Sequence, residues 1–302
     1  MVPSGFFSLV ILPLVLLLGA AVALVVGRRR ARTLSLDDEL YPGLRTLRLA
    51  TVRYRLLGLG LGLVAGVVAL PLGRLQPAFF AAPLIAASAV VAAIILGQQS
   101  AYRAARVVGS AGLERRQLRS YLPAGLTRSV AGLLALLVTA ILFTTLAASP
   151  DDMGRAGRAV AAWWMEGEGA ESAMRGSQRG PFPGSFYTLW LGAALVLLLA
   201  LAAAGLALTV RRPRNGADPE LVRVDDALRR ITVEGIVAAV GVGVGGAAFA
   251  VTLVAGMQLV SLAPVPVTTA SGVITLVGAV IALLGFFAAA VVLLVPRDGG
   301  AR

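Results

Sequence analysis

The stretch GIVAAVGVGVGGAAFAVTLV, at positions 235 to 254, decides the fold class. It carries no charged side chain over 20 residues, which is about the length that an α-helix needs to cross the 30 Å hydrocarbon core of a bilayer. It also opens a block of 62 charge-free residues, from Gly235 to Pro296, that has room for two such helices. A helix covering a soluble core would have a polar face, and this stretch has none. We therefore interpret it as a transmembrane helix.

The rest of the chain has the same character. Of its 302 residues, 58% are hydrophobic and 14% are charged, whereas about a quarter of a soluble domain is charged. Further charge-free blocks recur along the sequence, and we predict an all-α polytopic transmembrane bundle of seven helices that forms a single membrane domain over residues 1–302. The predicted spans are Phe6–Val26, Leu56–Leu72, Phe79–Leu96, Val130–Leu146, Phe186–Val210, Gly235–Val254 and Gly272–Val295.

The distribution of arginine predicts the orientation. All 27 basic residues are arginine, and 22 of them fall in loops 28–55, 103–128 and 211–230 and at the C-terminus, against five on the opposite side. Because basic loops stay in the cytoplasm, we expect the N-terminus outside and the C-terminus inside. The first apolar run is too long for a signal peptide, so we interpret it as an anchor. The basic loops are expected to bind anionic lipid headgroups, and because they contain almost no aromatic residues they argue against nucleic acid.

Several reactive residue types are missing altogether. The chain has no cysteine, histidine or lysine, which excludes disulfides, Cys/His metal sites, Ser-His and Cys-His nucleophiles, and a Walker A loop. We therefore expect no cofactor, no metal and no enzymatic activity. Exclusive use of arginine together with abundant Ala, Gly and Val is typical of a GC-rich bacterial genome. The predicted location is the bacterial cytoplasmic membrane.

The chain resembles itself at a distance of 181 residues. Residues 37–62 and 218–243 align without a gap and match at nine positions: Asp37, Glu39, Leu40, Leu47, Arg48, Thr51, Val52, Gly60 and Gly62 match Asp218, Glu220, Leu221, Leu228, Arg229, Thr232, Val233, Gly241 and Gly243. We interpret this as a parallel 3+1+3 repeat, in which copy A covers 6–97, copy B covers 187–295 and the span at 130–146 links them. Transporters contain repeats of this kind.

Glycines gather at corresponding places in the two copies. Gly58, Gly62 and Gly66 are spaced by four and lie along one helix face, and Gly241 and Gly245 belong to the second set. In lipid there is little hydrophobic drive between helices, so small residues that let backbones approach are favoured at contacts. We predict that these glycines pack spans two and six closely. The alternative is a hinge or a substrate path lined by backbone.

Two segments outside the predicted spans have recognisable patterns. Asp218 and Pro219 are typical of a helix N-terminus, and we expect that helix to continue into the sixth span. The extracytoplasmic loop 148–185 has Ser149 as a possible cap and Pro150 in the first turn. Val160, Trp163 and Trp164 follow at helical spacing, which predicts a short interfacial helix. A ligand lid is the alternative role for this loop.

One acidic residue lies at the edge of a predicted span. Glu234 falls opposite Arg53 under the 181-residue shift, and an arginine neighbour would offset the cost of a carboxylate at that depth. We predict that Arg53 or Arg55 pairs with Glu234. The alternative is a carboxylate that faces cytoplasmic water or pairs with Arg230, four residues back.

Three segments carry a resemblance to a group of proteins. RRQLRSYLP (115–123), SPDDMGRAGR (149–158) and GPFPGSFYT (180–188) are similar to loops of multi-pass integral membrane proteins of high-GC actinobacteria. The resemblance implies the compartment and the type of organism, and it assigns no functional residues.

Two functions fit these observations. The first is a permease-like membrane subunit of a transport system, whose ATPase or other subunit would be a separate chain; the repeat and the helical extensions favour it. The second is a membrane scaffold or regulatory partner that transports nothing, which the uniformly apolar spans favour.

Overall fold

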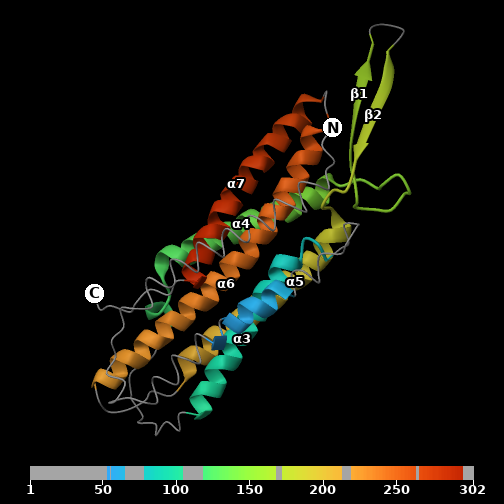
Figure 1. Cartoon of the computed structure of the whole chain (residues 1–302). Coiled ribbons are helices and arrows are strands. Elements are labelled where there is room, and N and C mark those ends of the chain that lie inside the picture. Colours follow the sequence, from blue (N-terminus) through green and yellow to red (C-terminus); the bar gives the residue numbers. More distant parts are fainter. Residues whose placement is uncertain are drawn as a thin grey trace.

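The computed structural model describes residues 53–54, 56–64, 78–104, 118–167, 172–212, 219–262 and 265–294. Within these ranges the chain forms an elongated helical bundle from which a β-hairpin projects at one end (Figure 1). The elements are the helical residues 56–64, α3 (Ala82–Ala104), the short helix η1 (Leu118–Ser120), α4 (Ala124–Ala147), β1 (Val160–Glu166), β2 (Ala173–Arg179), α5 (Ser185–Arg211), α6 (Pro219–Val260) and α7 (Pro266–Leu294).

Five of the described helices are long and apolar enough to cross a membrane. The spans are Ala82–Ser100, Ala124–Ala147, Ser185–Arg211, Asp225–Val260 and Pro266–Leu294. They coincide with the third to seventh predicted spans, so the helical prediction is confirmed there. The predicted first span lies outside the described residues, and only residues 56–64 of the second are described.

Helix α6 is the centre of the bundle. It contacts α3, α4, α5 and α7, and 72% of its most apolar window is buried, against 22% for α7. It runs unbroken for 42 residues from Pro219, so the predicted continuation of this helix into the sixth span is confirmed. Alanine and glycine make up much of its middle, and these small side chains let four neighbouring helices approach one axis.

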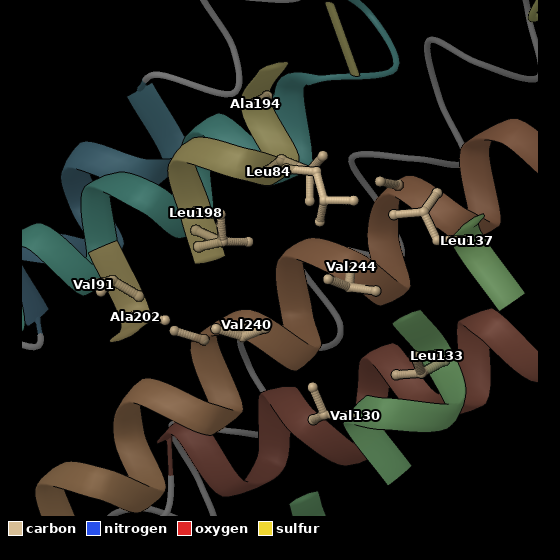
Figure 2. Close-up of a cluster of buried hydrophobic side chains, with 14 of the residues drawn as sticks. Leu84, Val91, Val130, Leu133, Leu137, Ala194, Leu198, Ala202, Val240 and Val244 are labelled. Atoms are coloured by element: carbon tan, nitrogen blue, oxygen red, sulfur yellow. The ribbon is translucent and has the colours of Figure 1, made fainter. Parts of the chain in front are cut away.

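The core between the helices is apolar. Figure 2 shows side chains from α3, α4, α5 and α6 converging on one layer. Its labelled members are Leu84, Val91, Val130, Leu133, Leu137, Ala194, Leu198, Ala202, Val240 and Val244. Two of the hydroxyls buried among the helices bond to their own helix: Ser88 Oγ donates to the Leu84 carbonyl at 2.8 Å and Thr252 Oγ1 to the Ala248 carbonyl at 2.6 Å. These two groups are therefore satisfied locally.

The predicted interfacial helix is wrong, and the helical bundle that the sequence predicts carries one β-hairpin in its place. Val160–Glu166 and Ala173–Arg179 form a two-stranded antiparallel sheet in which Trp164 pairs with Arg175. Val160 and Ala162 are buried while Trp163 and Met165 are exposed, which is the alternation of a strand. A seven-residue helix would be marginal in water, whereas the hairpin bonds its backbone across the sheet and covers Gly176 with the Trp163 ring.

The base of the hairpin is anchored on α6. Val160, Ala162 and Phe182 form a small buried cluster with Ala255, Leu259 and Leu262, at the end of α6. Ser149, predicted to cap a helix, instead exchanges two backbone hydrogen bonds with Ala159, at 2.7 and 3.2 Å. The loop between them turns at Gly157, whose φ of +71° favours glycine and whose α-carbon lies against Ser185.

Candidate functional site

Four of the five glycines assigned to helix packing lie at close helix contacts. A β-carbon at Gly58 would stand 2.9 Å from Ala93 Cβ, and one at Gly62 would stand 2.9 Å from the Ala86 carbonyl oxygen. The helical residues 56–64 thus pack on α3 through their glycine face. Gly60, on another face, has open space around it, and Gly66 lies outside the described residues.

The second glycine set makes contacts of the same kind with α7. A β-carbon at Gly241 would stand 2.8 Å from Ala289 Cβ, and one at Gly245 would stand 3.1 Å from the Phe286 backbone. Each glycine pair therefore meets the helix that follows it in the chain. The glycine contacts in the described residues join 56–64 to α3 and α6 to α7, and close packing of the second span on the sixth stays a prediction.

A buried ionic cluster joins the end of α5 to the start of α6. The Arg229 side chain is fully buried, and its Nε and Nη2 lie 2.9 and 2.8 Å from Asp225 Oδ2. Nη2 also donates to the Arg212 carbonyl at 2.9 Å, and Nη1 donates to the Thr209 and Val210 carbonyls, both at 3.3 Å. Asp225 Oδ1 pairs with the Arg212 side chain. The last carbonyls of a helix lack intrahelical partners and carry partial negative charge, so Arg229 caps α5.

Polar contacts extend the cluster toward α3 and η1. Thr209 Oγ1 lies 2.7 Å from the Gly205 carbonyl and 3.1 Å from Gln98 Oε1. Tyr121 donates its hydroxyl hydrogen to Asp226 Oδ1 at 3.0 Å. Sequence reasoning missed this cluster. The i, i+4 spacing of Asp225 and Arg229 was its only local signal, because the carbonyl partners come from another helix.

The predicted partners Arg53 and Glu234 lie in different surroundings. Glu234 lines a cavity between α4, α6 and α7, whereas the helix that follows Arg53 packs on α3. No ion pair between these two residues is found among the described contacts. Arg55 lies outside the described residues, so its pairing with Glu234 stays a prediction.

The cavity beside Glu234 has a volume of 350 Å³. It is bounded by the start of α4, one face of α6 and the last turns of α7. Its lining residues are Pro123, Ala124, Gly125, Leu126, Ser129, Val130, Leu133, Glu234, Gly285, Ala288, Ala289 and Val292. Glu234 is the one charged side chain in this lining. Groups of three or more His, Cys, Asp or Glu that could hold a metal ion are not found among the described residues.

The opposite end of the bundle carries its own polar contacts. Arg158 lies over the Phe186 ring, 3.6 Å from its centroid, at the start of α5. Desolvation raises the pKa of the Asp151 carboxyl, but hydrogen bonds from the backbone and side chain of Arg155 and from the Met153 backbone outweigh it. The pKa of Asp151 therefore lies below its usual value, and its carboxylate closes the loop between α4 and β1.

Comparison with protein-family models, with curated proteins and with solved structures finds no match. The class of the protein therefore follows from the fold itself. Five helices of this length and composition indicate a multi-pass membrane protein.

Proposed function

We propose that this chain is a permease-like membrane subunit of a transport system in the bacterial cytoplasmic membrane, with the energy supplied by a separate cytoplasmic ATPase. The single observation that carries the proposal is the extension of α6 before its apolar stretch. The 16 residues from Pro219 to Glu234 are helical, and at 1.5 Å per residue they add about 24 Å to a helix that already spans the bilayer.

The extension is held rigidly and carries charge. The Asp225–Arg229–Arg212 cluster fixes it to the end of α5, while Arg230 is exposed beside that cluster. A partner that docks on such an element can transmit movement to the bundle, because α6 contacts each of the other four long helices that the structure describes. A helical extension tied to α5 by this cluster is therefore better suited than an isolated surface loop to couple a docked partner to the helix bundle.

The distribution of charge supports the proposed orientation, with the N-terminus outside and the C-terminus inside. Arg119, Arg211, Arg212, Arg229 and Arg230 lie at the bundle end remote from the hairpin, and further arginines follow in the adjoining loops of the sequence. The positive-inside rule assigns this end to the cytoplasm and the hairpin to the exterior. Arginines at the inner end would also hold anionic headgroups.

The internal repeat, and with it seven spans, rests on the nine residue matches under the 181-residue shift. The glycines at the helix contacts are not equivalent positions under that shift, because Gly241 corresponds to Gly60 and Gly62 corresponds to Gly243. In each half, glycines four residues apart meet small residues or backbone of the next helix: Gly58 and Gly62 on α3, Gly241 and Gly245 on α7. We propose that residues 6–97 and 187–295 superpose about an axis near the membrane normal.

Affinity purification tests the proposal. A tagged full-length chain, extracted from its native membrane in mild detergent, should bring down a soluble subunit that binds ATP. Arg230→Glu should weaken this co-purification at least severalfold, while Arg175→Glu, an exposed arginine on the hairpin, should leave it unchanged. Loss of the partner with both variants, or with neither, would contradict docking on the extension.

A second function is favoured by the packing of the bundle. Away from the Asp225–Arg229 cluster, the buried side chains between the described helices are apolar or are hydroxyls bonded within the bundle, as with Thr145 and Thr188, whose oxygens lie 3.0 Å apart. Such an interior suits a scaffold that binds a partner and transports nothing. Co-purification of a stoichiometric partner that does not bind nucleotide would favour this function.

A further inference from the structure

The cavity beside Glu234 combines an apolar wall with one carboxylate. Gly125, Ala288 and Ala289 form part of the wall, and a β-carbon at Gly125 would meet nothing within 4 Å, so the 350 Å³ between α4 and α7 stays unfilled there. This volume lies within the range of about 300–1,000 Å³ that is usual for small-ligand sites. A ligand here would bury hydrocarbon against the wall, and a cationic group on it would be attracted to the Glu234 carboxylate.

The site is open at the side of the bundle. Ala288 is exposed, as are Leu284 and Val291 on the neighbouring turns of α7, so the entrance lies on an apolar face that lipid chains would cover. Glu234 comes immediately before the charge-free stretch of α6 and faces the first turn of α4. The carboxylate therefore lies at the depth of a headgroup and the wall at the depth of an acyl chain.

The polar groups around the entrance limit the kind of ligand that the cavity can bind. Ser129 donates its hydroxyl hydrogen to the Gly125 carbonyl at 3.1 Å, so it is engaged within α4. The Glu234 carboxylate has two oxygens with about four acceptor positions, so it can accept from a ligand while it keeps another contact. Arg128, whose Nε donates to the carbonyl of the lining residue Ala124 at 3.2 Å, puts a cation at the rim. A carboxylate and a guanidinium together suit a ligand that carries ammonium and phosphate.

We propose that this cavity binds a primary ammonium group attached to a hydrocarbon chain, with the ammonium on Glu234 and the chain along the Gly/Ala wall. A phosphatidylethanolamine of the cytoplasmic leaflet and a free long-chain amine both present this chemistry. The proposal requires that the chain is embedded in a membrane and does not depend on transport or on an ATPase.

Native mass spectrometry of the full-length chain in maltoside detergent tests the proposal with defined lipids. After delipidation, an equimolar mixture of phosphatidylethanolamine and phosphatidylglycerol should give preferential retention of the ethanolamine lipid. Glu234→Gln keeps the shape and removes the charge, and should lower that retention about tenfold, the usual effect of losing one charge-assisted hydrogen bond. Glu166→Gln, an exposed carboxylate on the hairpin, is the matched control and should change nothing.

A second pair of variants tests the wall without touching the carboxylate. Ala288→Leu should fill the cavity and lower retention severalfold, whereas Ala270→Leu, an exposed alanine near the other end of α7, should not. Because this pair keeps Glu234, it gives a result even if Glu234→Gln fails to fold.

The same variants with dodecylammonium distinguish the two sources. Retention of both amine ligands, dependent on Glu234 and Ala288, assigns the site to the lipid, and retention of dodecylammonium alone assigns it to a free amine. Equal retention of phosphatidylglycerol, or retention that neither variant lowers, would overturn the proposal.

Discussion

Replacing Arg229 by methionine tests whether the buried cluster holds α5 to α6. Methionine fills a similar volume but removes the guanidinium that bonds Asp225 and the carbonyls of Thr209, Val210 and Arg212. Removing one partner of a buried ion pair costs about 3–5 kcal/mol. Asp225 keeps its contact with the Arg212 side chain, so we expect the lower end, about 3 kcal/mol.

Thermal unfolding in detergent, followed by tryptophan fluorescence, measures this loss. At about 2–4 °C per kcal/mol, Arg229→Met should lower Tm by roughly 6–12 °C. Arg230→Met is the control, because that arginine is exposed and its loss should be worth within about 0.5 kcal/mol.

A double variant and a conservative one test the mechanism. Arg229→Met combined with Asp225→Leu should cost less than the sum of the two single variants, since the Asp225 carboxylate and the Arg229 guanidinium are then removed together and only Arg212 loses its partner. Arg229→Lys should fall between methionine and the native residue, because an ammonium cannot reproduce the planar fork of a guanidinium. Equal Tm values for Arg229→Met and Arg230→Met would refute the assignment of Arg229 as the cap of α5.

Three further predictions concern packing, pH and topology. Gly62→Leu should destabilise the chain by about 1–3 kcal/mol in the same assay because its side chain would meet the α3 backbone, while Gly60→Leu, in open space, should not; equal losses would contradict the packing. The folded pKa of Asp151 is depressed, so the loop closure it provides should be complete at neutral pH and be lost as pH falls below the ordinary value of 3.8. The protection of the Met153 and Arg155 amides against hydrogen exchange, relative to an unstructured peptide at the same pH, should fall as this closure is lost. In Asp151→Asn that protection should be low at every pH. A reporter active only in the cytoplasm should work at the C-terminus and stay silent at the N-terminus; the reverse would overturn the orientation.

The positions of the membrane helices could be read from the sequence because one requirement governs the whole segment. A chain in lipid must satisfy its backbone internally and exclude charge over about 20 residues, so charge-free blocks mark helices directly. The ends are less well marked. Helix α4 begins at Ala124 rather than Val130, because Arg128 can extend to the surface while its backbone stays helical.

A helix was predicted in place of the first hairpin strand because the spacing of the apolar residues in Val160–Glu166 fits both a helix and a strand. Val160, Trp163 and Trp164 satisfy helical spacing, and Val160, Ala162 and Trp164 satisfy the alternation of a strand equally well. Residues 160–166 form a strand because they pair with a second strand, AMRGSQR. That second segment has low apolar content and shows no strand pattern of its own. Its register with Val160–Glu166 is a tertiary property.

Only part of the candidate site could be predicted from the sequence, because the site also depends on tertiary contacts. Glu234 stood out as an ionisable residue beside a span, but the walls of its cavity come from α4 and α7, far away in the sequence. Arg229 was noticed only as a match to Arg48 in the repeat. Its role as a cap depends on where α5 ends in space.

Helix α6 connects the charged end of the bundle to the end that carries the hairpin. At 1.5 Å per residue its 42 residues form a rod about 63 Å long. Near one end the Arg229 cap ties the rod to α5, and at the other Ala255 and Leu259 hold the base of the hairpin. One continuous helix therefore carries both contacts, and the base of the hairpin lies about 39 to 45 Å along its axis from the Arg229 cap.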